Sequence, residues 1–221
     1  MLNDPLIQRR NGLALLSSPK QVSSHRIRLI CAAKDLDIDI KNIDLDKPKL
    51  DEEVLKANPT GRIPALHDRD FVLFGDRVLA EYIDERFPHP ALMPIEAKER
   101  AIIRLFSNEI EAIWYDYINQ LEHEKLAVSK KKQLQKKLYE SIIRFSPMFK
   151  ANSHFLIGDE LSLLDCCVLP AFWRLSYIGI EIPKSSSTAA MLNYMNYHFG
   201  KDYFKKSLSK YEKDLENKKG G

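Results

Sequence analysis

Few side chains in this sequence are spaced for metal or redox chemistry. The three cysteines are Cys31, Cys166 and Cys167, and none belongs to a Cys-x-x-Cys pair or has zinc-binding spacing. Cys166 and Cys167 are adjacent in a predicted helix, where a disulfide between them would distort the backbone. His25 and His123 each lack a second histidine at metal-ligand spacing. We therefore expect no metal site, and we interpret the cysteines as buried apolar residues in a reducing cytoplasm.

Serine hydroxyls gather around the start of the first predicted helix. Ser17 and Ser18 follow the apolar run Leu13–Leu16, and Ser23 and Ser24 come next. A hydroxyl near a helix N-terminus can stabilise a thiolate, and the helix dipole helps it to do so. Serine also serves in turns and as a helix cap. We interpret these serines as turn and cap residues, with Ser23 or Ser24 as the N-cap.

A proline-rich segment, Pro-His-Pro-Ala-Leu-Met-Pro, stands at residues 88–94. Two prolines fix the backbone in advance, so little conformational entropy is lost when a partner binds. The histidine between them can offer its ring for stacking or hydrogen bonding, and Leu92 and Met93 can offer an adaptable apolar patch. The alternative is a rigid hinge between domains with both apolar side chains buried, since proline-rich linkers are common.

Composition indicates a protein with an ordinary hydrophobic core. The chain has 221 residues, of which 44% are hydrophobic and 29% charged, and its net charge is +3. This excess is too small to predict nucleic-acid binding, and no apolar run is long enough for a membrane span. Five lysines between residues 130 and 137 predict a solvated helix face. A basic patch facing DNA, a nucleotide or an acidic partner is the alternative.

Apolar patterning predicts the order β-α-β-α-β-β-α up to residue 87. The expected strands are 13–16, 38–45, 63–66 and 71–74, and the expected helices are 23–36, 51–57 and 76–87. Pro64 cannot donate a sheet hydrogen bond, so it belongs at the start of its strand. Asp76 is a good N-cap for the third helix, and Pro88 prevents that helix from continuing.

Beyond residue 95 the pattern is entirely helical. One long helix carries apolar residues from Ile102 to Leu121, and later helices are expected at 129–149, 159–177, 187–198 and 201–216. The 159–177 helix is apolar nearly all round, which predicts the centre of a helical domain. Ser162 and Asp165 form a sequence similar to a capping box, so we interpret Asp165 as a buried cap.

Several motifs together carry a family resemblance. The strand, turn, strand and helix that begin at Gly-Arg-Ile-Pro resemble the second half of a thioredoxin-like domain. From about residue 13 to 215 the chain resembles the cytosolic glutathione transferase superfamily, and within it the stringent starvation protein A family. The motifs are Ser24-His25-Arg26-Ile27-Arg28, Glu81 to Pro94, Trp114-Tyr115, Leu161 to Cys167, Pro170, Trp173-Arg174-Leu175 and Gly179-Ile180-Glu181.

The resemblance implies a two-domain fold: an α/β N-terminal thioredoxin-like domain followed by an all-α C-terminal domain. We expect a flexible arm at 1–11, the thioredoxin-like domain at 12–87, the linker at 88–94, the helical domain at 95–216 and a tail at 217–221. It also implies a cis bond between Ile63 and Pro64, beside the place where the superfamily binds the cysteinyl part of a thiol ligand.

The same resemblance implies a disabled ligand cleft. Alignment of the first helix puts Gln21 at the nucleophile position, and an amide cannot supply the thiolate-stabilising proton. Gly75 and Asp76 replace the Glu-Ser pair that anchors the glutamyl part of glutathione, and an aspartate there repels the ligand carboxylate. We expect no catalysis and no cofactor. The alternative is a transferase or thiol reductase that uses a first-helix serine. The residues of the vestigial cleft are Ser17, Gln21, Ile63, Pro64, Gly75 and Asp76.

For function, the resemblance implies a cytoplasmic transcription regulator. Members of the family bind RNA polymerase holoenzyme, with its sigma factor, in starvation and stress responses, and one surface of the family is tied to this role. A homodimer and a heterodimer with a paralogue both remain open, and direct sequence-specific DNA binding is not expected. A stress nucleotide in the dimer cleft, near Arg26 and Arg28, is a further alternative. The corresponding partner-binding residues are Pro88, His89, Pro90, Leu92, Met93 and Pro94.

Overall fold

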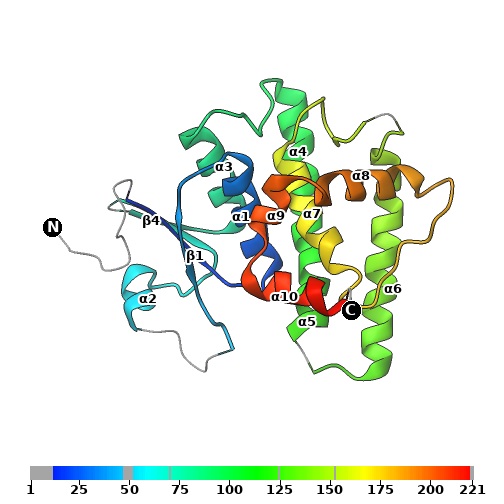
Figure 1. Ribbon diagram of the computed structural model, residues 1–221, viewed down its shortest axis with the longest axis horizontal. Helices are drawn as coiled ribbons and strands as arrows, with labels where there is room; N and C mark the ends of the chain where they lie inside the picture. The colour runs from blue at the N-terminus through cyan, green and yellow to red at the C-terminus, as the bar shows by residue number, and fades with distance from the viewer. Residues whose placement is uncertain (1–11, 47–51, 70, 124, 152, 220–221) are drawn as a thin grey trace. The chain divides into compact units, whose positions relative to one another are not determined.

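A computed structural model describes residues 12–219 apart from 47–51, 70, 124 and 152 (Figure 1). By contacts the chain divides into two compact units. The first holds the described residues up to Pro90 together with those from Lys206 onward, and the second holds Ala91–Lys205. The sequence had suggested that 95–216 forms one helical domain, whereas the residues from Lys206 onward group with the first unit. The expected arm at 1–11 lies outside the described residues.

A four-stranded mixed sheet forms the centre of the first unit. Its strands are β1 (Leu13–Ser17), β2 (Asp39–Asn42), β3 (Ala65–Asp68) and β4 (Phe71–Phe74), in the order β2-β1-β3-β4. Strand β1 runs parallel to β2 and antiparallel to β3, and β4 runs antiparallel to β3. This is the predicted thioredoxin-like arrangement.

Three strands differ from their predicted bounds, β1 only by including Ser17. Strand β3 begins at Ala65, two residues later than expected, because Pro64 has no amide hydrogen to contribute to the ladder. Strand β2 covers four residues rather than the expected 38–45, and each of the four pairs with one residue of β1. The bond between Ile63 and Pro64 is cis, as the resemblance implied.

Three helices accompany this sheet: α1 (Val22–Ala33), α2 (Glu52–Ala57) and α3 (Asp76–Arg86). Helices α1 and α3 pack together on one face of the sheet, and α2 lies on the other (Figure 1). The predicted caps of α1 and α3 are wrong. Gln21 occupies the N-cap of α1 rather than Ser23 or Ser24, and Gly75 occupies the N-cap of α3, so Asp76 is its first helical residue.

The second unit is helical. The expected long helix is a continuous run of α4 (Ala97–Glu109), a π-helical segment (Ile110–Tyr115) and α5 (Asp116–His123). Helix α6 spans Val128–Phe145 and is followed by a 3-10 turn at Ser146–Met148. The later helices are α7 (Leu163–Arg174), α8 (Ala189–Phe199) and α9 (Asp202–Ser207), and α10 (Lys210–Lys219) belongs to the first unit.

Helix α7 is the core of the second unit. Every one of its residues is buried, and it contacts α4, α8 and the π-helical segment. The helix begins at Leu163, four residues later than predicted, because Ser162 is its N-cap. The single helix expected at 201–216 is two helices, α9 and α10. Residues 217–219, predicted as tail, continue α10, and residues 220–221 lie outside the described residues.

Candidate functional site

The register of the sheet brings the residues of the vestigial cleft to one edge. Leu16 pairs with Ala65, and Ala65 pairs with Phe74, so these three residues form one row across the sheet. Ser17 follows the first member of the row, Pro64 precedes the second, and Gly75 follows the third. Because the strands alternate in direction, these neighbours lie at the same end of the sheet. Ser17, Pro64 and Gly75 therefore lie at one end of the sheet.

The serines at this edge are structural. Ser17 is fully buried, and its Oγ accepts a hydrogen bond of 2.7 Å from Arg28 Nη1. Ser24 is also fully buried, and its Oγ accepts from the backbone N–H of Ser18 at 3.0 Å. These contacts fix the turn between β1 and α1. Of the two serines that an enzyme could use, Ser24 is thus buried and bonded, while Ser23 is half-buried.

Gln21 stands where the resemblance puts the nucleophile. Its backbone carbonyl accepts from the N–H of His25 at 3.1 Å and so begins α1. The side-chain Oε1 is buried and has no hydrogen-bond partner among the described residues. The glutamine amide has an acceptor oxygen and two N–H donors, so it could hydrogen-bond a ligand, but it has no hydroxyl or thiol group.

The start of α3 is shaped by Gly75 and Asp76. Gly75 has a φ of 95°, a conformation that glycine adopts without strain. Asp76 lies in the first turn, where its carboxylate interacts favourably with the helix dipole. The same carboxylate repels any second anion at this helix end. A carboxylate thus occupies the helix end at this edge of the sheet.

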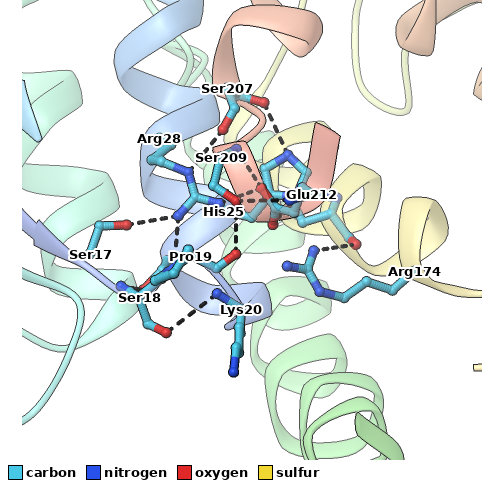
Figure 2. A network of polar contacts seen from close by, with 12 residues as sticks. Ser17, Ser18, Pro19, Lys20, His25, Arg28, Arg174, Ser207, Ser209 and Glu212 are labelled. Carbon is cyan, nitrogen blue, oxygen red and sulfur yellow. Dashed lines mark hydrogen bonds and ion pairs between the residues drawn. The ribbon is translucent and has the colours of Figure 1, made fainter. Parts of the chain in front are cut away.

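A buried ionic cluster lies behind this edge (Figure 2). Arg28 Nη2 donates to Glu212 Oε2 at 2.7 Å, and Arg28 Nε donates to the Ser207 carbonyl at 2.9 Å. His25 lies 3.4 Å from Glu212 Oε1 through Nδ1 and 3.0 Å from Ser207 Oγ through Nε2. The cluster joins α1 to α10. Sequence analysis missed it, because a residue pair so far apart in the chain leaves no local pattern.

This cluster bears on the nucleotide alternative. We had considered Arg26 and Arg28 as groups near a bound anion. Arg26 is buried, and Arg28 is buried with its guanidinium bonded to Glu212, Ser207 and Ser17. Arg28 is therefore committed to holding the fold, and it does not present a cationic surface to a phosphate.

The proline-rich segment is exposed in its first half and buried in its second. Pro88, His89 and Pro90 are exposed, whereas Leu92 is 2% and Met93 8% exposed. The predicted apolar patch is therefore wrong for these two side chains, which line a pocket of about 230 Å³ in the second unit. Pro94 is half-buried and lines the same pocket. The solvent-facing candidates are the two prolines and the histidine between them.

Other predicted groups have structural roles. All three cysteines are buried, and burial raises the pKa of the Cys31 thiol to about 12. The lysines between residues 130 and 137 are exposed on α6 opposite its buried face, which agrees with a solvated helix surface. Among the described residues no group of histidine, cysteine and acidic side chains is placed to hold a metal ion. The side chain of His123 lies outside the described part of the structure.

Asp165 completes the capping box that the sequence predicted. Its Oδ2 accepts from the backbone N–H of Ser162 at 2.8 Å, and its Oδ1 accepts from Leu156 N at 3.1 Å and Tyr194 Oη at 2.9 Å. Burial raises the pKa of the carboxyl to about 6, although these hydrogen bonds oppose the shift. Every contact belongs to the core of the second unit, so Asp165 is a structural residue.

Comparison with known proteins agrees with this architecture. Residues 22–86 match the model of the glutathione S-transferase N-terminal domain, and residues 105–196 match that of the C-terminal domain. The chain is 35% identical over 209 residues to a stringent starvation protein A homolog of Coxiella burnetii, covering 94% of this chain and 96% of the relative. The chain belongs to the stringent starvation protein A family. A homolog from Haemophilus influenzae is also 35% identical, over 90% of this chain and 92% of its own.

Solved structures of transferases share the fold. A Tau class glutathione S-transferase from mango superposes with a TM-score of 0.79 at 20% identity, covering 96% of this chain and 99% of its own. Maleylacetoacetate isomerase from Anaeromyxobacter dehalogenans, solved with bound glutathione, superposes with a TM-score of 0.73 at 21% identity. The match covers 88% of this chain and 94% of the isomerase. None of the helices in the described part of this chain has the length and apolar character of a membrane span.

Proposed function

We propose that this protein is a non-catalytic transcription regulator that binds RNA polymerase holoenzyme in starvation and stress responses. The observation that carries the proposal is an exposed Pro88-His89-Pro90 loop in a chain of the stringent starvation protein A family. The state of the cleft supports it. Gln21 is at the position that the resemblance assigns to the nucleophile, and Asp76 puts a carboxylate in the first turn of α3. The hydroxyl groups of Ser17 and Ser24 are engaged in hydrogen bonds within the first unit.

The loop has the properties of a recognition surface. Prolines on both sides of His89 restrict the backbone, so a partner that docks there orders little additional chain. The exposed imidazole offers both hydrogen-bond donor and acceptor atoms and an aromatic face. Leu92 and Met93 are buried, so the docking surface consists of the loop and not of the apolar residues beyond it.

Polymerase pull-down tests the proposal. Holoenzyme is captured with native protein, with His89→Ala and with His154→Ala, which removes another exposed histidine ring. We expect His89→Ala to fold normally and to lose most of the captured polymerase, and His154→Ala to capture as much as native protein. Equal capture by a folded His89→Ala variant would rule out docking through the loop.

The family member is further proposed to act as a dimer, either with itself or with a paralogue. Sedimentation of the purified protein separates these two cases. A stable homodimer at micromolar concentration supports self-association. A monomer that dimerises only with a second, related chain supports the heterodimer.

A glutathione-dependent enzyme is the second candidate. The matches to the glutathione S-transferase N-terminal and C-terminal domain models favour it. Ser23 is the remaining hydroxyl on the first helix that is neither fully buried nor bonded to the preceding turn. Titration calorimetry with millimolar glutathione distinguishes the two functions. Heat of binding together with turnover that disappears in Ser23→Ala would establish the enzyme, and no heat agrees with the regulator.

A further inference from the structure

We propose that Lys34 is a positioning residue that holds the Pro88–Pro90 loop in its binding conformation. The inference rests on the proposed function, since it concerns how that loop is presented to polymerase. Lys34 follows α1 directly and belongs to the same compact unit as the loop. Nothing in its local sequence, Ala-Ala-Lys-Asp, distinguishes it from an ordinary surface lysine at the end of a helix.

The Lys34 side chain is fully buried, and its ammonium makes three short contacts. Nζ lies 2.7 Å from the carbonyl oxygen of Phe87, 2.6 Å from the carbonyl oxygen of Pro90 and 2.7 Å from Asp84 Oδ1. An ammonium has three N–H donors, so these acceptors use all of them. The carboxylate comes from α3, and the two carbonyl groups enclose Pro88 and His89.

The proline loop needs an external donor of this kind. Phe87 and Pro90 are three residues apart, the separation at which a turn closes by a hydrogen bond from the N–H of the last residue to the carbonyl of the first. Pro90 has no N–H, so the turn cannot close in this way. Lys34 Nζ instead binds the carbonyl groups of both residues. One buried cation thus replaces the missing closing bond.

The energetic cost of this arrangement indicates that the loop matters. An ammonium withdrawn from water is strongly destabilising unless it is paired and hydrogen-bonded. A methionine could fill the same space between α1 and α3 without that cost, as apolar residues often replace buried ion pairs with no loss of stability. Such a replacement would leave the two loop carbonyl groups without a donor. What lysine supplies, and an apolar residue cannot, is the fixed conformation of the loop.

Two variants separate loop positioning from general stability. Lys34→Met combined with Asp84→Leu removes both charges of this ion pair. Asp84→Asn removes the carboxylate charge but leaves the ammonium on both loop carbonyl groups. Each variant is compared with native protein and with His89→Ala for melting temperature, for amide hydrogen exchange at His89 and Ala91, and for polymerase affinity.

We expect the double variant to melt near the native temperature, to exchange faster at His89 and Ala91, and to bind polymerase about tenfold more weakly, because the loop must be ordered on docking. Asp84→Asn should lower the melting temperature, because the buried ammonium loses its carboxylate, but it should keep near-native exchange at His89 and Ala91 and near-native affinity. If amide exchange at His89 and Ala91 is unchanged in the double variant, the proposal is overturned. It is also overturned if the double variant binds polymerase with native affinity while His89→Ala binds weakly. Native affinity in His89→Ala itself overturns the docking function instead.

A measurement on native protein keeps the inference testable if the double variant does not fold. Ammonium protons of solvated lysines exchange too fast to be seen individually near neutral pH. The three contacts of Lys34 predict a slowly exchanging ammonium signal that is lost in Lys34→Gln. A Lys34 ammonium that exchanges as fast as those of the exposed lysines on α6 overturns the proposal.

Discussion

His198 is uncharged at neutral pH because burial lowers its pKa to about 4. Its Nε2 lies 2.6 Å from the carbonyl oxygen of His154, and its Nδ1 lies 2.5 Å from the hydroxyl of Tyr203. A carbonyl can only accept, so Nε2 carries the proton and Nδ1 accepts from the tyrosine. Protonation of Nδ1 would place a positive charge in this buried site and would require the tyrosine hydroxyl to turn and accept. His198 therefore makes the second unit sensitive to acid.

The expected pH dependence follows from the direction of this shift. The folded pKa of His198 lies below its ordinary value of 6.5, so its contribution to stability is complete above pH 6.5 and is lost as the pH falls toward 4. Asp165 acts in the opposite direction, because its folded pKa of about 6 exceeds its ordinary value of 3.8. As the pH falls from 6 to 4, protonation of Asp165 therefore raises the free energy of unfolding and opposes the contribution of His198.

A glutamine at position 198 isolates the histidine contribution. Its amide can donate to the His154 carbonyl and accept from Tyr203, but it does not titrate. We expect His198→Gln to lose less unfolding free energy than native protein between pH 7 and pH 4.5, measured by denaturant titration. His89→Ala, which removes an exposed histidine of the first unit, serves as the control. An equal loss in native protein and His198→Gln would contradict this assignment.

At the scale of elements, the first turn of α3 decides what the cleft can hold. The N-terminus of a helix attracts anions through its free N–H groups and its dipole. Asp76 places a negative charge at that position. We expect Asp76→Ser to strengthen glutathione binding several-fold, since serine keeps a polar first turn and removes the repulsion. Calorimetry measures the change, with Glu85→Ser, at an exposed position later in α3, as the control. Unaltered affinity would mean that Asp76 does not block the site.

Element prediction from the sequence succeeded where the cause was local. The apolar runs at 13–16 and 71–74 are strands β1 and β4, and the stripe that includes Leu134 and Leu138 is the buried face of α6. The prediction failed where residues distant in the chain determine a cap or the burial of a side chain. Ser24 is a good cap by type, yet the turn before α1 takes its hydroxyl. The burial of Leu92 and Met93 likewise depends on the packing of the second unit, which their neighbours in the chain do not encode.

At the scale of the molecule, α10 is part of the first unit although it follows the whole second unit in the chain. Glu212 Oε2 accepts from Arg28 at 2.7 Å and from the backbone N–H of Ser209 at 2.7 Å. Removal of one partner from a buried ion pair leaves the other charge uncompensated. We expect Glu212→Gln to lower the free energy of unfolding by about 3 kcal/mol, while Lys213→Gln at the next, exposed position has little effect. Denaturant unfolding measures both, and equal stability of the two variants would contradict the role of the cluster.

The position of α10 also sets an order of events during synthesis. The ribosome releases the strands, α1 and the proline loop well before it adds the residues from Lys206 onward, and domains generally fold as they emerge. Until α10 arrives, the Arg28 guanidinium has no Glu212 carboxylate to accept from it. A nascent or prematurely terminated chain therefore carries a first unit that cannot reach its full stability. A chain cut short before α10 should therefore be cleaved by added protease faster than the whole chain.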